Sequence, residues 1–197
     1  MKTNTDHITI GRNPALTIAI VQARLLSTRL PGKVLADVCG QPMLARQMAR
    51  MQLAQHLDEI VVAIPESTTD DTLAAFCVMR GWALFRGSET DVLGRYLGAA
   101  EASGADTVVR VTADCPLIDP FVIDAAVLLH RCGTIHGPLD FVANNLVSTF
   151  PHFTKSQSII IESQNCLPSM AQPLKSINST LEIKPCVAQS SCRAVAA

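Results

Sequence analysis

Four short and mostly apolar runs recur along the first 112 residues, at 18–21, 60–64, 82–85 and 107–112. Each is far too short to cross a membrane, and its length suits a buried strand. Strands that are apolar throughout are typical of a parallel sheet whose two faces are both covered. Segments with helical spacing separate the runs. The alternation therefore predicts an α/β fold of three layers, α/β/α and Rossmann-like, around a mostly parallel sheet.

The intervening segments carry helix signals. Apolar residues recur at helical spacing after Pro42, with a methionine stripe that is typical of core packing. Asp119 followed by Pro120 is a strong helix start, and Gly104 is a suitable helix end. Ser88 and Asp91 have the spacing of a capping box, although the usual fourth residue is Glu or Gln. The predicted helices run from 43 to about 55, from Thr68 or Thr69 to about 80, from the region of Asp91 to near 104, and from 120 to 130, with a fifth strand at 141–143.

Composition excludes several classes of protein. A chain of 197 residues suffices for one α/β domain, and its net charge of −1 gives no general attraction to nucleic acid or to an anionic membrane. The polar start, 1–16, lacks a secretory pattern and is predicted to be a flexible leader. The seven cysteines form no C-x-x-C pair, which argues against zinc or a redox dithiol. We therefore expect a reduced, cytoplasmic protein with no nucleic-acid or membrane partner.

A basic loop, residues 22–33, follows the first apolar run. It carries Arg24, Arg29 and Lys33 together with a Pro-Gly turn. Guanidinium groups, an ammonium and free backbone amides suit a polyphosphate. The loop is neither a Walker A motif nor a G-x-G-x-x-G loop. The alternative is a solvated loop whose arginines pair with surface acids.

Polar residues also follow the later strands. Arg86 and Gly87 end the third strand, and Asp114 follows the fourth. Because the carboxyl ends of parallel strands share one edge of a sheet, these residues should converge with the basic loop. A carboxylate opposite a polyphosphate loop is well placed to bind Mg²⁺. The alternatives are that Asp114 caps its own turn and that Arg110, on the same strand, is a buried ion-pair partner rather than a ligand contact.

Three extended motifs, at 20–35, 86–96 and 110–120, resemble in order and spacing those of the SpsF-type spore-coat polysaccharide cytidylyltransferases. These are relatives of the CMP-KDO and CMP-sialic acid synthetases. A shorter segment, 141–145, resembles a fourth motif. The resemblance covers about 17–151. It implies a nucleotide-diphospho-sugar transferase fold and a reaction in which a sugar or sugar acid attacks the α-phosphorus of CTP, releasing pyrophosphate.

The resemblance also implies roles for individual residues. Asp114 would bind Mg²⁺, and Arg24, Lys33 and Asp114 would be the catalytic set. The residues expected to contact the nucleotide are Gln22, Ala23, Arg24, Arg29, Lys33, Arg86, Gly87 and Asp91. Asp91 has the alternative role of a helix cap.

The chain changes character in the last segment, 152–197. From Pro151 onward there is no glycine and no aspartate, although the first 150 residues contain ten and eleven. We expect a divergent, poorly ordered tail beside the nucleotidyltransferase core of 17–151, either variable or shifted out of frame. The resemblance implies a second acidic metal ligand in this segment. The fold would then be incomplete at its C-terminal part and would lack that ligand, and a homodimer would be doubtful. The alternatives to an active cytidylyltransferase are a non-catalytic nucleotide-binding remnant and a nucleotide-sugar-dependent glycosyltransferase.

Overall fold

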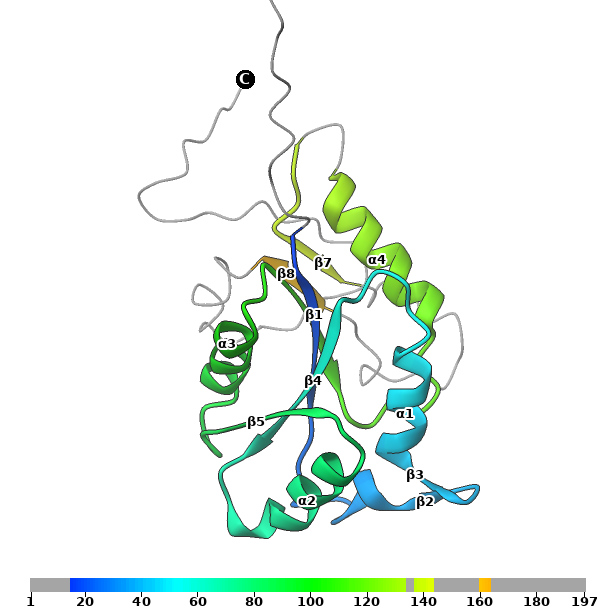
Figure 1. The fold of residues 1–197 in the computed structure, drawn as a ribbon, viewed down its shortest axis with the longest axis vertical. Helices are drawn as coiled ribbons and strands as arrows, with labels where there is room; N and C mark the ends of the chain where they lie inside the picture. The colour runs from blue at the N-terminus through cyan, green and yellow to red at the C-terminus, as the bar shows by residue number, and fades with distance from the viewer. Residues whose placement is uncertain (1–14, 134–136, 144–159, 164–197) are drawn as a thin grey trace, which may run out of the picture.

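The computed structural model describes residues 15–133, 137–143 and 160–163, and a six-stranded sheet forms its centre (Figure 1). The strand order is β5-β4-β1-β6-β8-β7. The first four strands of that order are parallel to one another, whereas β8 is antiparallel to both β6 and β7. The predicted mostly parallel sheet is confirmed. The strands are β1 (Thr17–Gln22), β4 (Glu59–Pro65), β5 (Ala83–Gly87), β6 (Thr107–Thr112), β7 (Phe141–Ala143) and β8 (Ile160–Ser163).

Helices cover both faces of the sheet, as the sequence predicts. Residues of α1, α2 and α4 share one core cluster with the sheet, and α3 shares a second cluster with β1, β4 and β6. In Figure 1, α3 lies on one side of the central strands, and α1 and α4 lie on the other. The helices are α1 (Met43–Met51), α2 (Asp71–Met79), α3 (Val92–Ser103) and α4 (Pro120–Cys132).

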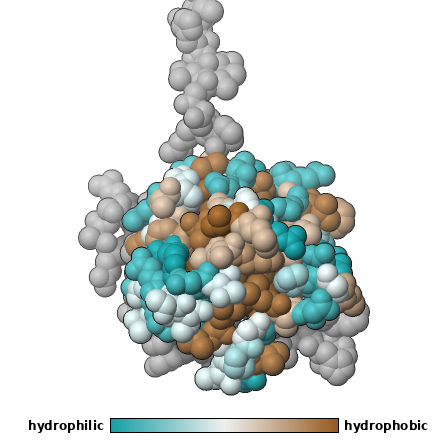
Figure 2. Space-filling model, turned by 60° about the horizontal axis from the view of Figure 1, so that its bottom comes forward, coloured by the Kyte–Doolittle hydropathy of each residue, from teal (hydrophilic) through white to brown (hydrophobic). Residues whose placement is uncertain are grey.

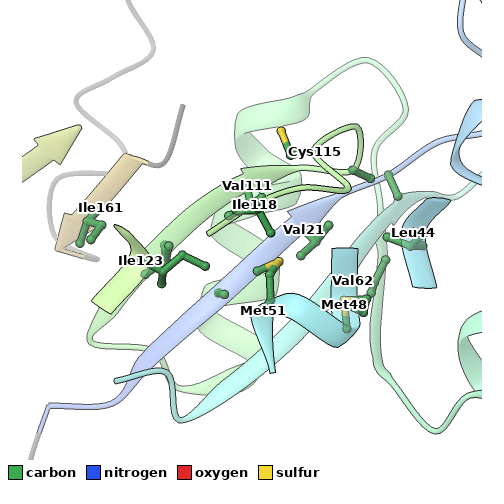
Figure 3. Packing of buried hydrophobic residues seen from close by; sticks show 14 of the residues in the cluster. Val21, Leu44, Met48, Met51, Val62, Val111, Cys115, Ile118, Ile123 and Ile161 are labelled. Carbon is green, nitrogen blue, oxygen red and sulfur yellow. The ribbon is translucent and has the colours of Figure 1, made fainter. Parts of the chain in front are cut away.

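The larger cluster is built from alternate residues of the central strands. Val21 of β1 and Val62 of β4 are fully buried, and they share the cluster with Met48 and Met51 of α1 (Figure 3). Full burial of a side chain of this size stabilises the fold by roughly 1.5–3 kcal/mol. The predicted role of the methionine stripe as core is therefore confirmed.

Helix boundaries follow their capping residues. Asp119 accepts a hydrogen bond from the amide of Phe121 and Pro120 begins α4, as predicted. Gly104 ends α3 with φ +67°, a conformation that glycine adopts at low cost. Two boundaries were predicted wrongly. Helix α1 ends at Met51 rather than near 55, and Thr68–Asp70 forms a 3-10 turn (η2), so that α2 begins only at Asp71.

Three small elements were not predicted. A 3-10 turn, η1 (Lys33–Leu35), ends the basic loop, and a hairpin of β2 (Asp37–Val38) and β3 (Gln41–Pro42) follows it. Strand β8 lies inside the segment predicted as a tail, and its Ile161 is fully buried opposite Val109 of β6. The leader, apart from its last two residues, and most of the tail lie outside the described residues.

Candidate active site

The carboxyl ends of β1, β4, β5 and β6 meet at one edge of the sheet, at the lower end of Figure 1. The predicted convergence is confirmed in this sense: the basic loop, Arg86–Gly87 and Asp114 all leave the sheet at that edge. Figure 2, in which this end comes forward, shows hydrophobic residues across the middle of the face and hydrophilic residues beside them. Exposed leucines of the loops at this edge are Leu26, Leu30 and Leu117.

Backbone and side-chain contacts close the basic loop upon itself. The amide of Gly32 donates to the carbonyl of Leu25 at 2.8 Å, and Gly32 has φ +70°, which permits the turn. The amide of Leu25 donates to the Asp70 carboxylate at 2.6 Å. Asp70 is only 1% exposed, so this buried acid of η2 fixes the start of the loop. Asp70 was not among the predicted site residues.

Lys33 and Asp114 are in direct contact. The Lys33 Nζ atom lies 2.9 Å from Asp114 Oδ2, although the two residues are 81 positions apart in the chain. Their side chains are 29% and 27% exposed, so a ligand arriving from solvent can reach both. The two groups that the sequence assigned to phosphate and metal binding therefore lie together.

The Asp114 carboxylate is held in its ionised form. Burial raises the pKa of this carboxyl, but hydrogen bonds from Thr112 and Lys33 and the charge of Lys33 outweigh burial and leave the pKa below its ordinary value. The Thr112 hydroxyl contributes by donating to Asp114 Oδ1 at 2.6 Å. Asp114 is thus an anion at neutral pH, as a metal ligand has to be.

Gln47 of α1 supports the turn that carries Asp114. Its side chain is fully buried, with Nε2 donating to the carbonyl of Thr112 at 2.8 Å and Oε1 accepting from the amide of Cys115 at 3.0 Å. Both residues that flank the Ala113–Asp114 turn are therefore fastened to the helix. Sequence reasoning missed Gln47. The one available signal was a glutamine on the buried side of the methionine stripe.

The other predicted residues of the basic loop take several environments. Arg24 and Arg29 are exposed, Gln22 is half-buried, and Ala23 is 2% exposed within the larger core cluster. Among the interactions of the described residues, no hydrogen bond or ion pair joins Arg24 to Asp114. Its charge acts instead on Arg95 of α3. The predicted contacts of these four loop residues with the nucleotide stay predictions.

The predicted residues at the end of β5 make structural contacts in this structure. Arg86 forms an ion pair with Asp71 at 2.8 Å and donates to the carbonyl of Ser67 at 2.9 Å. The carbonyl of Gly87 accepts from the amide of Glu66 at 2.8 Å. Asp91 is the N-cap of α3 and accepts from the amide of Gly94, the alternative that the sequence left open.

The side chain of Arg110 of β6 lies against α3. Its guanidinium stacks 4.6 Å from the centre of the Tyr96 ring.

Among the described residues, no group of three or more His, Cys, Asp and Glu side chains could enclose a metal ion. Mg²⁺ does not require such a cage, since it is commonly held by one or two carboxylates together with substrate phosphates and water. A single ionised carboxylate beside a lysine fits that arrangement. The residues present therefore suit a divalent cation that arrives with a polyphosphate.

A mostly parallel α/β sheet with cationic and acidic loops at its carboxyl edge is the arrangement in which open α/β proteins bind nucleotides and other ligands. The sequence model of the cytidylyltransferase family matches residues 18–134, and the chain belongs to this family. The spore coat polysaccharide biosynthesis protein SpsF of Bacillus subtilis is 39% identical over 117 residues, which cover 56% of this chain and 48% of that protein. The 3-deoxy-manno-octulosonate cytidylyltransferase of Geobacter sulfurreducens is 36% identical over 147 residues, 66% of this chain and 55% of that enzyme. The chain spans about half the length of the curated relatives that it matches.

Solved structures share the fold. A cytidylyltransferase from Leptospira borgpetersenii superposes with a TM-score of 0.71 at 31% identity, over 79% of this chain and 63% of that chain. More distant structures with the same fold include a CMP:2-keto-3-deoxy-manno-octonic acid synthetase complexed with CTP (TM-score 0.62, 18% identity, 83% and 80% coverage). Another is Rv0371C of Mycobacterium tuberculosis complexed with manganese (TM-score 0.57, 13% identity, 81% and 76% coverage). Within the part of the chain that the structure describes, no helix is long and apolar enough to span a membrane.

Proposed function

We propose that this protein is a divalent-cation-dependent cytidylyltransferase that transfers CMP from CTP to a sugar or sugar acid and releases pyrophosphate. The observation that carries the proposal is the contact of 2.9 Å between Lys33 and Asp114 at the carboxyl edge of the sheet. Membership of the cytidylyltransferase family supports cytidylyl transfer over the glycosyl transfer that the sequence left open. The names of the relatives support a sugar acid as acceptor and surface polysaccharide as its destination.

In the proposed site, Lys33 exchanges its ion pair with Asp114 for the phosphates of CTP, and Arg24 and Arg29 bind further phosphate oxygens from the exposed part of the loop. Nucleotidyl transfer depends on orienting the phosphates in line with the attacking hydroxyl and on neutralising their charge. The fixed loop, closed by Gly32 and Asp70, provides the orientation. Gln22, Ala23, Arg86, Gly87 and Asp91 are proposed to surround the base and ribose.

Asp114 would hold the divalent cation, for which we propose Mg²⁺. Such an ion would supply positive charge that offsets the negative charge of the phosphates. Thr112 and Gln47 keep the carboxylate ionised and its turn fixed, so Asp114 needs no rearrangement other than release from Lys33.

The direct test is pyrophosphate release from CTP and Mg²⁺ with a panel of sugar acids and neutral sugars. We expect release with at least one sugar acid, and we expect Lys33→Ala and Asp114→Ala each to reduce turnover by at least about a hundredfold, because each removes a charge that stabilises the transition state. Glu59→Ala is a matched control, since Glu59 is an exposed acid at the opposite end of β4.

The proposal would be wrong if a folded Asp114→Ala or Lys33→Ala protein turned over at the wild-type rate. Circular dichroism of each variant verifies the fold independently of activity. Turnover that fell equally in Glu59→Ala would point to a general loss of structure instead.

A second candidate is a nucleotide-binding protein without turnover. The observation that favours it is that, among the described residues, one acid, Asp114, lies beside Lys33 and no group of three metal-ligating side chains is found. CTP with Mg²⁺ would then raise the melting temperature without releasing pyrophosphate for any acceptor.

A further inference from the structure

Arg95 is a buried cation in the first turns of α3. It is 2% exposed, and its Nη1 donates to the carbonyl of Ser88. Its Nε, also buried, has no hydrogen-bond partner among the described residues. Arginine carries five donors and a permanent charge, and buried charges are ordinarily paired closely because desolvation is costly. No ion pair to Arg95 is found within the described part of the chain, so its burial calls for a reason other than core packing.

The side chain of Arg95 lies behind the loop that follows β5. A Cβ atom at Gly87 would come within 3.3 Å of Arg95 Cγ, so the absence of a side chain at Gly87 leaves room for Arg95 to pass. From there the guanidinium reaches Ser88, whose hydroxyl in turn accepts from the amide of Asp91 at 3.0 Å. Arg95 thus fastens the segment between β5 and α3 to the helix.

The same side chain is also coupled to the basic loop. Arg24, Asp70 and Asp91 all lie close enough for their charges to act on Arg95. Asp70, 1% exposed, holds the amide of Leu25, the residue next to Arg24. Two buried residues of opposite charge, Arg95 and Asp70, thus interact near the start of the loop.

Charges of both signs act on the Arg95 guanidinium. Burial lowers the pKa of the Arg95 guanidinium, and Arg24 adds to the lowering, whereas Tyr96, Asp70 and Asp91 act in the opposite direction. The positive charges of Arg95 and Arg24 repel one another, so a polyanion that binds between or beside them lowers the electrostatic free energy. The effect is strong because the effective dielectric near a protein surface is well below that of water.

We propose that Arg95 is a positioning residue of the nucleotide site, which holds the loop after β5 through Ser88 and adds a buried positive charge behind Arg24 that strengthens polyphosphate binding. The proposal rests on the proposed function for the identity of the nucleotide. Its physical content, however, is affinity for a phosphate chain, and inorganic tripolyphosphate measures that affinity without the base.

The experiment uses the full chain and two variants. Arg95→Met removes the charge and keeps most of the aliphatic volume, while Arg95→Lys keeps the charge but loses the fork of donors. The control is Arg131→Met, because Arg131 donates to Thr17 at 2.8 Å at the other end of β1. Calorimetric titration gives the Kd of CTP, of inorganic tripolyphosphate and of cytidine, and the melting temperature of the ligand-free protein is measured beside it.

We expect Arg95→Met to weaken CTP and tripolyphosphate by about tenfold, which corresponds to about 1.4 kcal/mol. Arg95→Lys should weaken them by about threefold, and in each variant cytidine, which carries no phosphate, should lose less affinity than tripolyphosphate does. Arg131→Met should leave the three affinities unchanged.

The role would be refuted if folded Arg95→Met melted at a lower temperature but bound tripolyphosphate within twofold of wild type, because Arg95 would then be a core residue only. Equal losses for cytidine and tripolyphosphate would also refute it. If Arg95→Met does not fold, the test uses Arg95→Lys. A loss of tenfold or more in the affinity of Arg95→Lys for tripolyphosphate would contradict a role through charge, because lysine keeps the charge. Wild-type protein that binds tripolyphosphate but not CTP would overturn the proposed function while the Arg95 comparison still stands.

Discussion

Replacing Gln47 with methionine should destabilise the protein, although polar residues of helices are usually exposed and tolerate substitution. The side chain is fully buried and bridges the carbonyl of Thr112 at 2.8 Å and the amide of Cys115 at 3.0 Å. Methionine has a similar volume, so the packing is largely kept and the two backbone groups lose their hydrogen bonds to Gln47. A buried polar group without a partner costs about 1–3 kcal/mol, and we therefore expect a loss of roughly 2–4 kcal/mol.

The assay is equilibrium unfolding in urea, followed by circular dichroism, with the melting temperature as a second measure. For a chain of this length a loss of that size lowers the melting temperature by roughly 4–16 °C. Gln52→Met is the matched control, since Gln52 is the exposed residue just after the end of α1. That variant should stay within about 0.5 kcal/mol of wild type.

A Gln47→Met protein as stable as Gln52→Met would refute the reasoning. It would mean that the two backbone groups find water or new partners, so that Gln47 does not fasten the Asp114 turn. A large loss in both variants would assign the effect to the helix rather than to the bridge.

Three further outcomes are expected. Asp119→Ala should cost about 1 kcal/mol in urea unfolding, because it removes the N-cap of α4, and an unchanged midpoint would contradict this. Asp114 has a lowered pKa in the folded protein, so its charge should stabilise the wild type relative to Asp114→Asn. This stabilisation should be complete above the ordinary carboxyl pKa of about 4 and should disappear as the pH falls through the lower pKa of the folded protein. Melting scans from neutral to acidic pH check this, and a difference in melting temperature that does not shrink in acid contradicts it. Burial raises the pKa of Cys115 and of Cys77 to about 11. Iodoacetamide at pH 8 should therefore label the exposed Cys39 much faster than either of them. Equal labelling rates by mass spectrometry would contradict the buried placement.

The sheet could be predicted because its central strands are buried on both faces and hence apolar throughout. Strand β8 could not, since its four residues lie in a polar, glycine-free segment and depend on pairing with β6 and β7. The hairpin of β2 and β3 has only two residues in each strand, too few for any periodic signal. Capping residues such as Asp119 were predictable because their effect is local to the next turn.

The candidate site was predictable where it follows from topology. Lys33 and Asp114 follow β1 and β6, which are neighbours in the sheet, and their contact needs only that order and the parallel direction. Gln47, Asp70 and Arg95 escaped because a polar residue in a helix or a turn is expected to face solvent. Their partners are distant in sequence, so only the folded chain shows that these side chains are buried supports of the loops.

The most direct test of the proposed site compares the affinity for CTP with Mg²⁺ and with EDTA, in wild type, Asp114→Ala and Lys33→Ala. If one nucleotide is held by both groups through a divalent cation, wild type should bind CTP about tenfold or more tightly with Mg²⁺. Asp114→Ala should show no such gain, and Lys33→Ala should bind more weakly in both conditions. An Asp114→Ala protein that keeps the full wild-type gain from Mg²⁺ would contradict the proposed site.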